Sequence, residues 1–205
     1  IVGNGGTAWS AADVSNGYTT IAMPFAMQYG QTSIGRGVTL YVSADGYVTT
    51  GDPSMSGIVI APLGTTSGFT NKRANTIYTK VESNKVTVEW RKLKIGNNMV
   101  SFQLVLTNTG AIKFQYGPMT LSTTAQVFAA MQSSSADIYN LSTVDNRWDT
   151  IVPTYLSLTQ TRTLSLTVHP YYDVNTNQGL CYTFAQPECA KPNSFGAVPG
   201  DNNVI

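Results

Sequence analysis

Apolar and polar residues alternate with a period of two along residues 77–117. Turns rich in Ser, Asn and Gly interrupt the alternation at 83–84, 96–98 and 108–110. Alternation with this period places successive side chains on opposite faces of a strand, and such turns indicate antiparallel pairing. The pattern therefore predicts a meander of antiparallel strands with one buried face. The positions that share one face within each segment are Ile77, Thr79 and Val81; Val86, Val88 and Trp90; Phe102, Leu104 and Leu106; and Ile112, Phe114 and Tyr116.

Short apolar segments on both sides of the meander predict further strands. We expect Asp45-Gly46 to form a type I′ hairpin turn, and Pro62 to end the strand before it. Ten or so short strands with regularly spaced turns predict an all-β fold, a two-sheet antiparallel sandwich that is jelly-roll-like. The additional segments expected to be strands are 19–23, 38–43, 47–50, 58–61, 127–131, 155–158, 164–168 and 180–184.

Three segments lack the alternation. Residues 1–17 are rich in Gly, Asn and Ser, and Trp9 is the large apolar residue expected to anchor them to the sandwich. Residues 64–74 are expected to form a polar surface loop. Residues 133–150 form the longest stretch predicted to be irregular.

The composition changes near the C-terminus. Pro and Gly recur from Pro187 onward, as is typical of a linker or of the first strand of another module. We therefore expect a β-sandwich domain over residues 1–186, with residues 187–205 as the linker or the start of a following module.

Charge and composition exclude several classes of partner. The 205 residues carry a net charge of +1, and only 11% of them are charged, so no field attracts nucleic acid or anionic lipid. No apolar run reaches the length of a membrane-spanning helix, which argues against membrane insertion. Polarity comes from Ser, Thr, Asn and Gln instead, which is typical of secreted or surface β-proteins. The chain begins without Met, consistent with a mature or trimmed form.

The two cysteines, Cys181 and Cys189, lie eight positions apart. An oxidising compartment would favour a disulfide that closes this small loop. Two unpaired thiols remain the alternative. A zinc site is disfavoured, because two thiols and one distant histidine do not supply its ligands.

No residue pattern typical of catalysis stands out. His169 is the one histidine, and no Gly-x-Ser-x-Gly elbow accompanies it, so a role at a strand end is favoured over a hydrolase triad. Glu82 and Glu89 lie on neighbouring predicted strands, where a glycosidase could hold paired carboxylates. Ion pairing with Lys80 or Arg91 explains the two glutamates without catalysis.

The aspartates in predicted loops are candidate ligands for calcium. Asp45, Asp52, Asp145 and Asp149 fall in predicted loops, and extracellular sandwiches use such residues to bind Ca²⁺. No Asp-x-Asp-x-Asp run is present, and aspartates in turns and caps are commoner, so we expect no cofactor.

The residues most typical of a binding site cluster in the predicted irregular region. An exposed aromatic ring beside polar groups can stack on a sugar while those groups bind its hydroxyls. The alternative is that Trp148 fills the edge of the sandwich beneath a loop. The candidate ligand-binding residues are Trp148, Tyr139, Arg147, Asp145 and Asp149.

Residues 18–118 resemble a known kind of module. The segments Leu40-Tyr-Val-Ser-Ala-Asp-Gly-Tyr-Val-Thr, Ile58-Val-Ile-Ala-Pro-Leu63 and Gly110-Ala-Ile-Lys-Phe-Gln-Tyr-Gly117 are similar to β-sandwich modules of large secreted surface proteins from Bacteroidetes-type bacteria, and more loosely to nidogen-type extracellular domains. Cys189-Ala-Lys-Pro192 looks like the opening of a fibronectin type III module. In the Bacteroidetes-type modules, acidic residues follow Ala-Pro-Leu. Gly64-Thr-Thr66 replaces them here, so the resemblance implies no binding residue in this chain.

The resemblance implies a non-catalytic module of a multidomain bacterial protein, secreted or at the cell surface. We expect cell adhesion or binding of an extracellular carbohydrate or protein, with neighbouring domains of the same polypeptide as further partners. The alternatives are a structural spacer or assembly subunit, and an accessory domain of a secreted hydrolase whose catalytic domain lies elsewhere.

Overall fold

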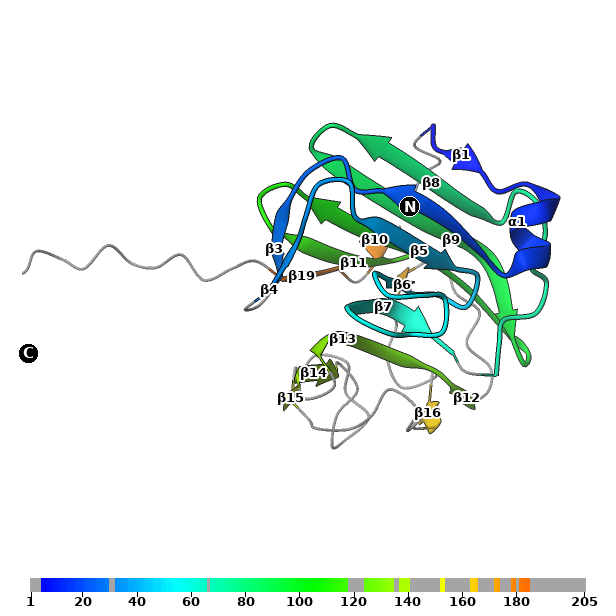
Figure 1. The fold of residues 1–205 in the computed structure, drawn as a ribbon. Helices are drawn as coiled ribbons and strands as arrows, with labels where there is room; N and C mark the ends of the chain where they lie inside the picture. Colours follow the sequence, from blue (N-terminus) through cyan, green and yellow to red (C-terminus); the bar gives the residue numbers. More distant parts are fainter. Residues whose placement is uncertain are drawn as a thin grey trace, which may run out of the picture.

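The computed structural model describes residues 5–29, 32–65, 67–117, 124–134, 137–140, 152–153, 163–165, 172–173, 178–179 and 181–184. Two large antiparallel sheets pack together over these residues (Figure 1), which confirms the all-β sandwich. None of the described helices is long and apolar enough to cross a membrane.

The first sheet contains the predicted meander. It has six strands in the order β1-β8-β9-β10-β11-β19, and each pair of neighbours is antiparallel. The apolar positions predicted for residues 77–117 are buried, apart from Thr79 and Val81 on β8. Val81 is 47% exposed. The strands are β1 (Thr7–Ala8), β8 (Ile77–Glu82), β9 (Lys85–Ile95), β10 (Asn98–Thr107), β11 (Ile112–Tyr116) and β19 (Cys181–Phe184).

The second sheet has seven strands in the order β15-β14-β13-β7-β6-β5-β2. In both sheets the strands follow one another in chain order, so each is built as a meander interrupted by excursions to the other sheet. β14 lies within residues 133–150, where the sequence predicted irregular structure. The strands are β2 (Tyr18–Ala22), β5 (Thr39–Ser43), β6 (Val48–Thr49), β7 (Val59–Gly64), β13 (Phe128–Ser134), β14 (Asp137–Asn140) and β15 (Val152–Pro153).

Three short two-stranded ladders complete the described secondary structure. The hairpin of β3 (Met27–Tyr29) and β4 (Thr32–Ile34) lies at the opposite end of the sandwich from helix α1 (Ala11–Asn16) (Figure 1). The segment predicted around residue 164 is a strand, and it pairs with residues 124–126. The other ladder strands are β12 (Thr124–Gln126), β16 (Thr163–Ser165), β17 (Tyr172–Asp173) and β18 (Gln178–Gly179).

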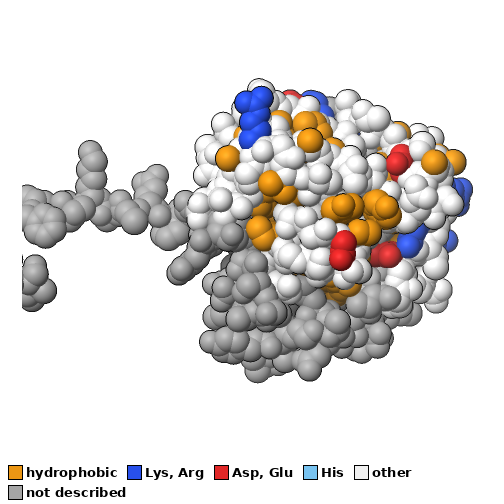
Figure 2. Space-filling model, viewed as in Figure 1, with side chains coloured by type: hydrophobic (Ala, Val, Ile, Leu, Met, Phe, Trp, Pro, Cys, Tyr) orange, Lys and Arg blue, Asp and Glu red, His pale blue; other side chains and the backbone are white. Residues whose placement is uncertain are grey.

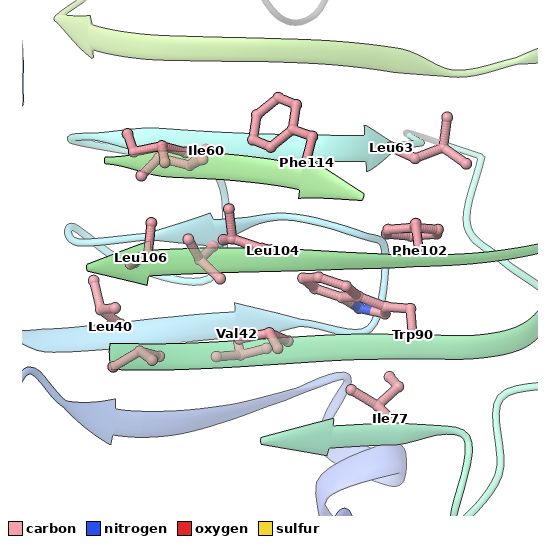
Figure 3. Packing of buried hydrophobic residues seen from close by; sticks show 14 of the residues in the cluster. Leu40, Val42, Ile60, Leu63, Ile77, Trp90, Phe102, Leu104, Leu106 and Phe114 are labelled. Carbon is pink, nitrogen blue, oxygen red and sulfur yellow. The ribbon is translucent and has the colours of Figure 1, made fainter. Parts of the chain in front are cut away.

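The core lies between the two sheets and centres on Trp90. Side chains of both sheets gather there (Figure 3). The ring of Trp90 stacks on Phe102, with centroids 5.0 Å apart. Its Nε1–H donates to the backbone oxygen of Ser43 at 2.9 Å, and the hydroxyl of Tyr116 donates to the backbone oxygen of Pro62. Each of these two hydrogen bonds joins one sheet to the other, which fixes how the sheets are stacked.

The Asp45-Gly46 turn differs from the predicted type I′ turn. Gly46 has a φ of 88°, whereas Asp45 has no positive φ, and the backbone N–H of Ser43 donates to Tyr47 across a three-residue loop. A type I turn followed by a left-handed residue has this geometry. A Cβ on Gly46 would lie 2.0 Å from the backbone oxygen of Leu63, so close packing also requires glycine here.

Two expectations about residues 58–74 were wrong in detail. Pro62 lies inside β7 rather than after it, at the place where the register with β13 shifts between Phe128 and Ala130. A proline, which has no N–H to donate, is tolerated there because the ladder is irregular at this point. The polar loop that follows does not lie wholly at the surface, because the side chain of Phe69 is buried in the core.

The N-terminal segment contains a helix that the sequence analysis treated as irregular. The hydroxyl of Ser10 accepts from the N–H of Asp13, and the Asp13 carboxylate accepts from the N–H of Ser10, which makes a capping box for α1. Gly17 ends the helix with a φ of 79°. Trp9, 3% exposed, anchors the segment as expected.

Candidate functional site

The predicted ligand-binding cluster falls mostly outside the described residues. Trp148, Arg147, Asp145 and Asp149 all lie beyond them. Tyr139 lies on β14 opposite Met131 and Pro153, and its side chain is not among those described. The cluster therefore stays a prediction, and the candidate site must be sought elsewhere.

The same holds for two other predicted features. Cys181 is exposed at the start of β19, opposite Gln115 of β11, while Cys189 lies outside the described residues. The disulfide stays a prediction. His169 also lies outside them.

The loop aspartates of the described chain have structural roles. The Oδ1 atom of Asp45 contacts Lys72 Nζ at 2.6 Å and accepts the N–H of Phe69 at 3.1 Å. This carboxylate therefore fastens the residue 64–74 loop to the β5–β6 turn. Asp52 accepts from the N–H of Ser54 at 2.7 Å within its own turn, and hydrogen bonds from Ser54 lower the pKa of Asp52. Among the described residues, no group of three or more His, Cys, Asp or Glu side chains could hold a metal ion.

Glu82 and Glu89 do not form a glycosidase pair. Glu89 lies opposite Tyr78, four residues along β8 from Glu82, which separates their backbones by about 13 Å. Paired catalytic carboxyl groups are held about 5–9.5 Å apart. Glu82 is bound instead by Lys80 at 3.4 Å and Lys85 at 3.2 Å, and the hydrogen bond from Lys85 lowers its pKa.

The most unusual charged group is Glu89, on the outer face of the six-stranded sheet. It is 1% exposed although its side chain alternates with the core residues Val88 and Trp90. Arg91, two residues further along β9, donates from Nε to Oε1 at 2.7 Å and from Nη2 to Oε2 at 2.9 Å. This bidentate contact raises the pKa of Arg91. The Arg91 guanidinium also lies 3.8 Å from the centre of the Tyr78 ring, a cation–π contact that fixes all three side chains.

A β-bulge adjoins this arrangement. The register of β9 with β10 shifts between Val100 and Phe102, and Lys92 takes a φ of 51°. A left-handed backbone is strained for a lysine, and such strain recurs at functional sites. The Ser101 hydroxyl accepts the N–H of Lys92 at 3.0 Å, and Asn71 donates to the Lys92 carbonyl at 3.1 Å. The bulge is thus supported from both sides.

Two glutamines continue the row across the sheet. Strand register places Tyr78 opposite Glu89, Glu89 opposite Gln103, and Gln103 opposite Gln115. Gln103 is 5% exposed, and its side chain lies on the same face of the sheet as Glu89 and Gln115. We call the five outward-facing residues Tyr78, Glu89, Arg91, Gln103 and Gln115 the Glu89 face.

The Glu89 face presents polar groups that can bind a polar ligand. It offers two amides, each of which both donates and accepts, beside a guanidinium held in one orientation. With four strands about 4.8 Å apart, the row from Tyr78 to Gln115 is about 14 Å long. The sequence analysis considered Arg91 only as an ion-pair partner for a glutamate and did not single out the glutamines. These residues are polar positions that alternate with the core residues of successive strands, but only the strand register brings them into one row.

No known family matches the chain, and neither a curated protein nor a solved structure shows significant similarity to it.

Proposed function

We propose that the chain is a non-catalytic, extracellular or cell-surface module that binds a carbohydrate through the Glu89 face. The observation that carries the proposal is the Gln103 amide, which lies opposite Glu89 and Gln115 in the row across the sheet, beside the bidentate Glu89–Arg91 pair. Sugar hydroxyls donate and accept at once, as an amide does, so they can hydrogen-bond to it. A ligand site commonly owes its specificity to a small number of polar groups in fixed positions.

The rest of the face supports this role. The Glu89–Arg91 pair and its contact with Tyr78 hold these three side chains in place before any ligand arrives. Preorganisation of this kind reduces the entropic cost of binding. Among the described residues Lys113, one row away on β11, has no ion-pair partner, so the face also accommodates a weakly acidic sugar.

The wider context agrees with an extracellular role. Only 11% of residues are charged, and the net charge is +1, which gives no reason to expect a nucleic acid partner. The resemblance of residues 18–118 to sandwich modules of Bacteroidetes-type secreted surface proteins, and of Cys189-Ala-Lys-Pro192 to the opening of a fibronectin type III module, supports placement within a larger adhesive polypeptide. The predicted aromatic cluster around Trp148 would add a second contact to the same class of ligand.

Binding of this chain to a glycan array tests the proposal. Gln103→Leu keeps the approximate shape of the side chain and removes its hydrogen bonding. We expect it to weaken binding about tenfold, the loss of one or two buried hydrogen bonds. Ser83→Lys, at the exposed turn between β8 and β9 of the same sheet, is the control and should bind as the unaltered chain does.

Four outcomes would contradict the proposal. Glycan binding that is unaffected by Gln103→Leu would place the site elsewhere. Binding to matrix proteins but to no glycan would favour protein adhesion. An absence of binding to both glycans and matrix proteins would favour a structural spacer, an assembly subunit or an accessory domain of a secreted hydrolase. Turnover of any bound sugar would refute the non-catalytic assignment.

A further inference from the structure

Half of the backbone hydrogen-bonding groups of the edge strand β2 find no partner among the described residues. β2 ends the seven-stranded sheet, and within the described part of the chain it pairs with β5 alone. Backbone hydrogen bonds from Ala44 N–H to Gly17 at 2.8 Å and from Met23 N–H to Val38 at 2.9 Å flank the strand. Because bonding alternates along an antiparallel strand, the N–H and C=O groups of Tyr18, Thr20 and Ala22 point away from β5. No described residue pairs with them.

This edge lacks the usual protection against pairing. Natural edge strands carry lysine, proline or a bulge, or are covered by another element. β2 reads Tyr-Thr-Thr-Ile-Ala, without charge, proline or glycine, and its register with β5 is unbroken. β8 of the other sheet has two of these protections. β1 pairs with part of it, and the part beyond carries the charged residues Lys80 and Glu82.

Charges at the two ends of β2 make the edge self-complementary. Asp13 belongs to α1, which leads into the first residue of β2. Arg36 belongs to the turn whose Gly37 N–H donates to Met23, just after the last residue of β2. Arg36 is exposed and has no ion-pair partner among the described residues. An antiparallel copy of β2 would bring each Asp13 toward the other copy's Arg36, whereas a parallel copy would bring like charges together.

We propose that β2 pairs antiparallel with β2 of a second copy of this chain, about a two-fold axis at Thr20, so that the two seven-stranded sheets become continuous. Tyr18 then lies opposite Ala22 of the partner, and Thr20 opposite Thr20, a cross-strand pair that is favourable in sheets. The contact is isologous, so it closes as a dimer. The strand is only about 17 Å long, so we expect a dimer that forms as concentration rises rather than a permanent one. The inference is independent of the Glu89 face, which lies on the other sheet.

Sedimentation velocity over a wide range of protein concentration tests the proposal. The unaltered chain should shift from monomer to dimer. Thr20→Lys places two lysines directly opposite each other at the axis and should raise the dissociation constant roughly tenfold or more. Arg36→Glu should weaken the dimer because it places Glu beside the partner's Asp13. Thr183→Lys, on the edge strand of the other sheet, should leave the dimer intact.

Circular dichroism and unfolding by urea would establish that all variants remain folded, as expected for exposed positions. A chain that stays monomeric at the highest concentration would overturn the proposal. So would a dimer that survives Thr20→Lys, or one that Thr183→Lys disrupts equally. Glycan binding by Thr20→Lys should match that of the unaltered chain, so failure of the dimer and failure of the carbohydrate proposal can be told apart.

Discussion

Replacing Trp90 should remove a large part of the stability of the sandwich. The side chain is fully buried, stacks on Phe102 with an interplanar angle of 19°, and donates across the core to Ser43. Truncation of a buried tryptophan to alanine costs about 3–5 kcal/mol. The carbonyl of Ser43 also loses its partner, which costs about 1–3 kcal/mol unless water enters the cavity. Since domains are stable by about 5–15 kcal/mol, Trp90→Ala should be close to unfolding.

The separate contributions can be measured with a second variant. Trp90→Phe keeps an aromatic ring against Phe102 but cannot donate to Ser43, so we expect a loss of about 2–3 kcal/mol. Urea unfolding followed by circular dichroism gives both values from the shift in midpoint. Val81→Ala is the control, because Val81 is 47% exposed and should change stability by less than about 0.5 kcal/mol. A loss below about 1 kcal/mol for Trp90→Ala would refute the reasoning.

Three further predictions concern the backbone and acid stability. Lys92→Gly should stabilise the fold by up to about 1 kcal/mol in urea unfolding, because φ at Lys92 is 51°; a clear loss would mean that the lysine side chain is needed at the bulge. Gly46→Ala should destabilise it by more than about 2 kcal/mol, because its Cβ would meet the Leu63 oxygen; a neutral result in the same assay would contradict the packing there. Hydrogen bonds from Ser10 lower the pKa of Asp13, so its contribution is present above the ordinary value of 3.8 and is lost as pH falls through the lowered pKa. Asp13→Asn should therefore flatten the acid limb of a stability–pH curve, and an unchanged limb would count against the capping box.

The sequence predicted those parts of the fold that follow from local alternation. The meander, the burial of Trp90 and the anchoring by Trp9 were confirmed. The first two follow from the alternation within each strand, and the third follows from the size of the Trp9 side chain. The helix α1 was missed, since six residues are too few for a visible period, although its capping residues Ser10, Asp13 and Gly17 were readable.

The Glu89 face could not be predicted in the same way. Alternation placed Glu89 on the side away from the core, and such a position is normally exposed. Its burial depends on Arg91, which folds back along the same strand and onto Tyr78. The placement of Gln103 opposite Glu89 and Gln115 depends on strand register, which a single strand's pattern does not contain. The open edge of β2 likewise became visible only when the order of the strands was known.

The chain order of the strands has a consequence for how the molecule acquires its shape. Pairings among β8, β9, β10 and β11 join segments separated by short turns, so little entropy is lost in closing them. Pairing of β1 with β8 and of β11 with β19 joins segments about seventy residues apart and should come late, since distant contacts slow folding. On the ribosome, the hairpins through β11 can therefore assemble before the final strand of that sheet has been synthesised.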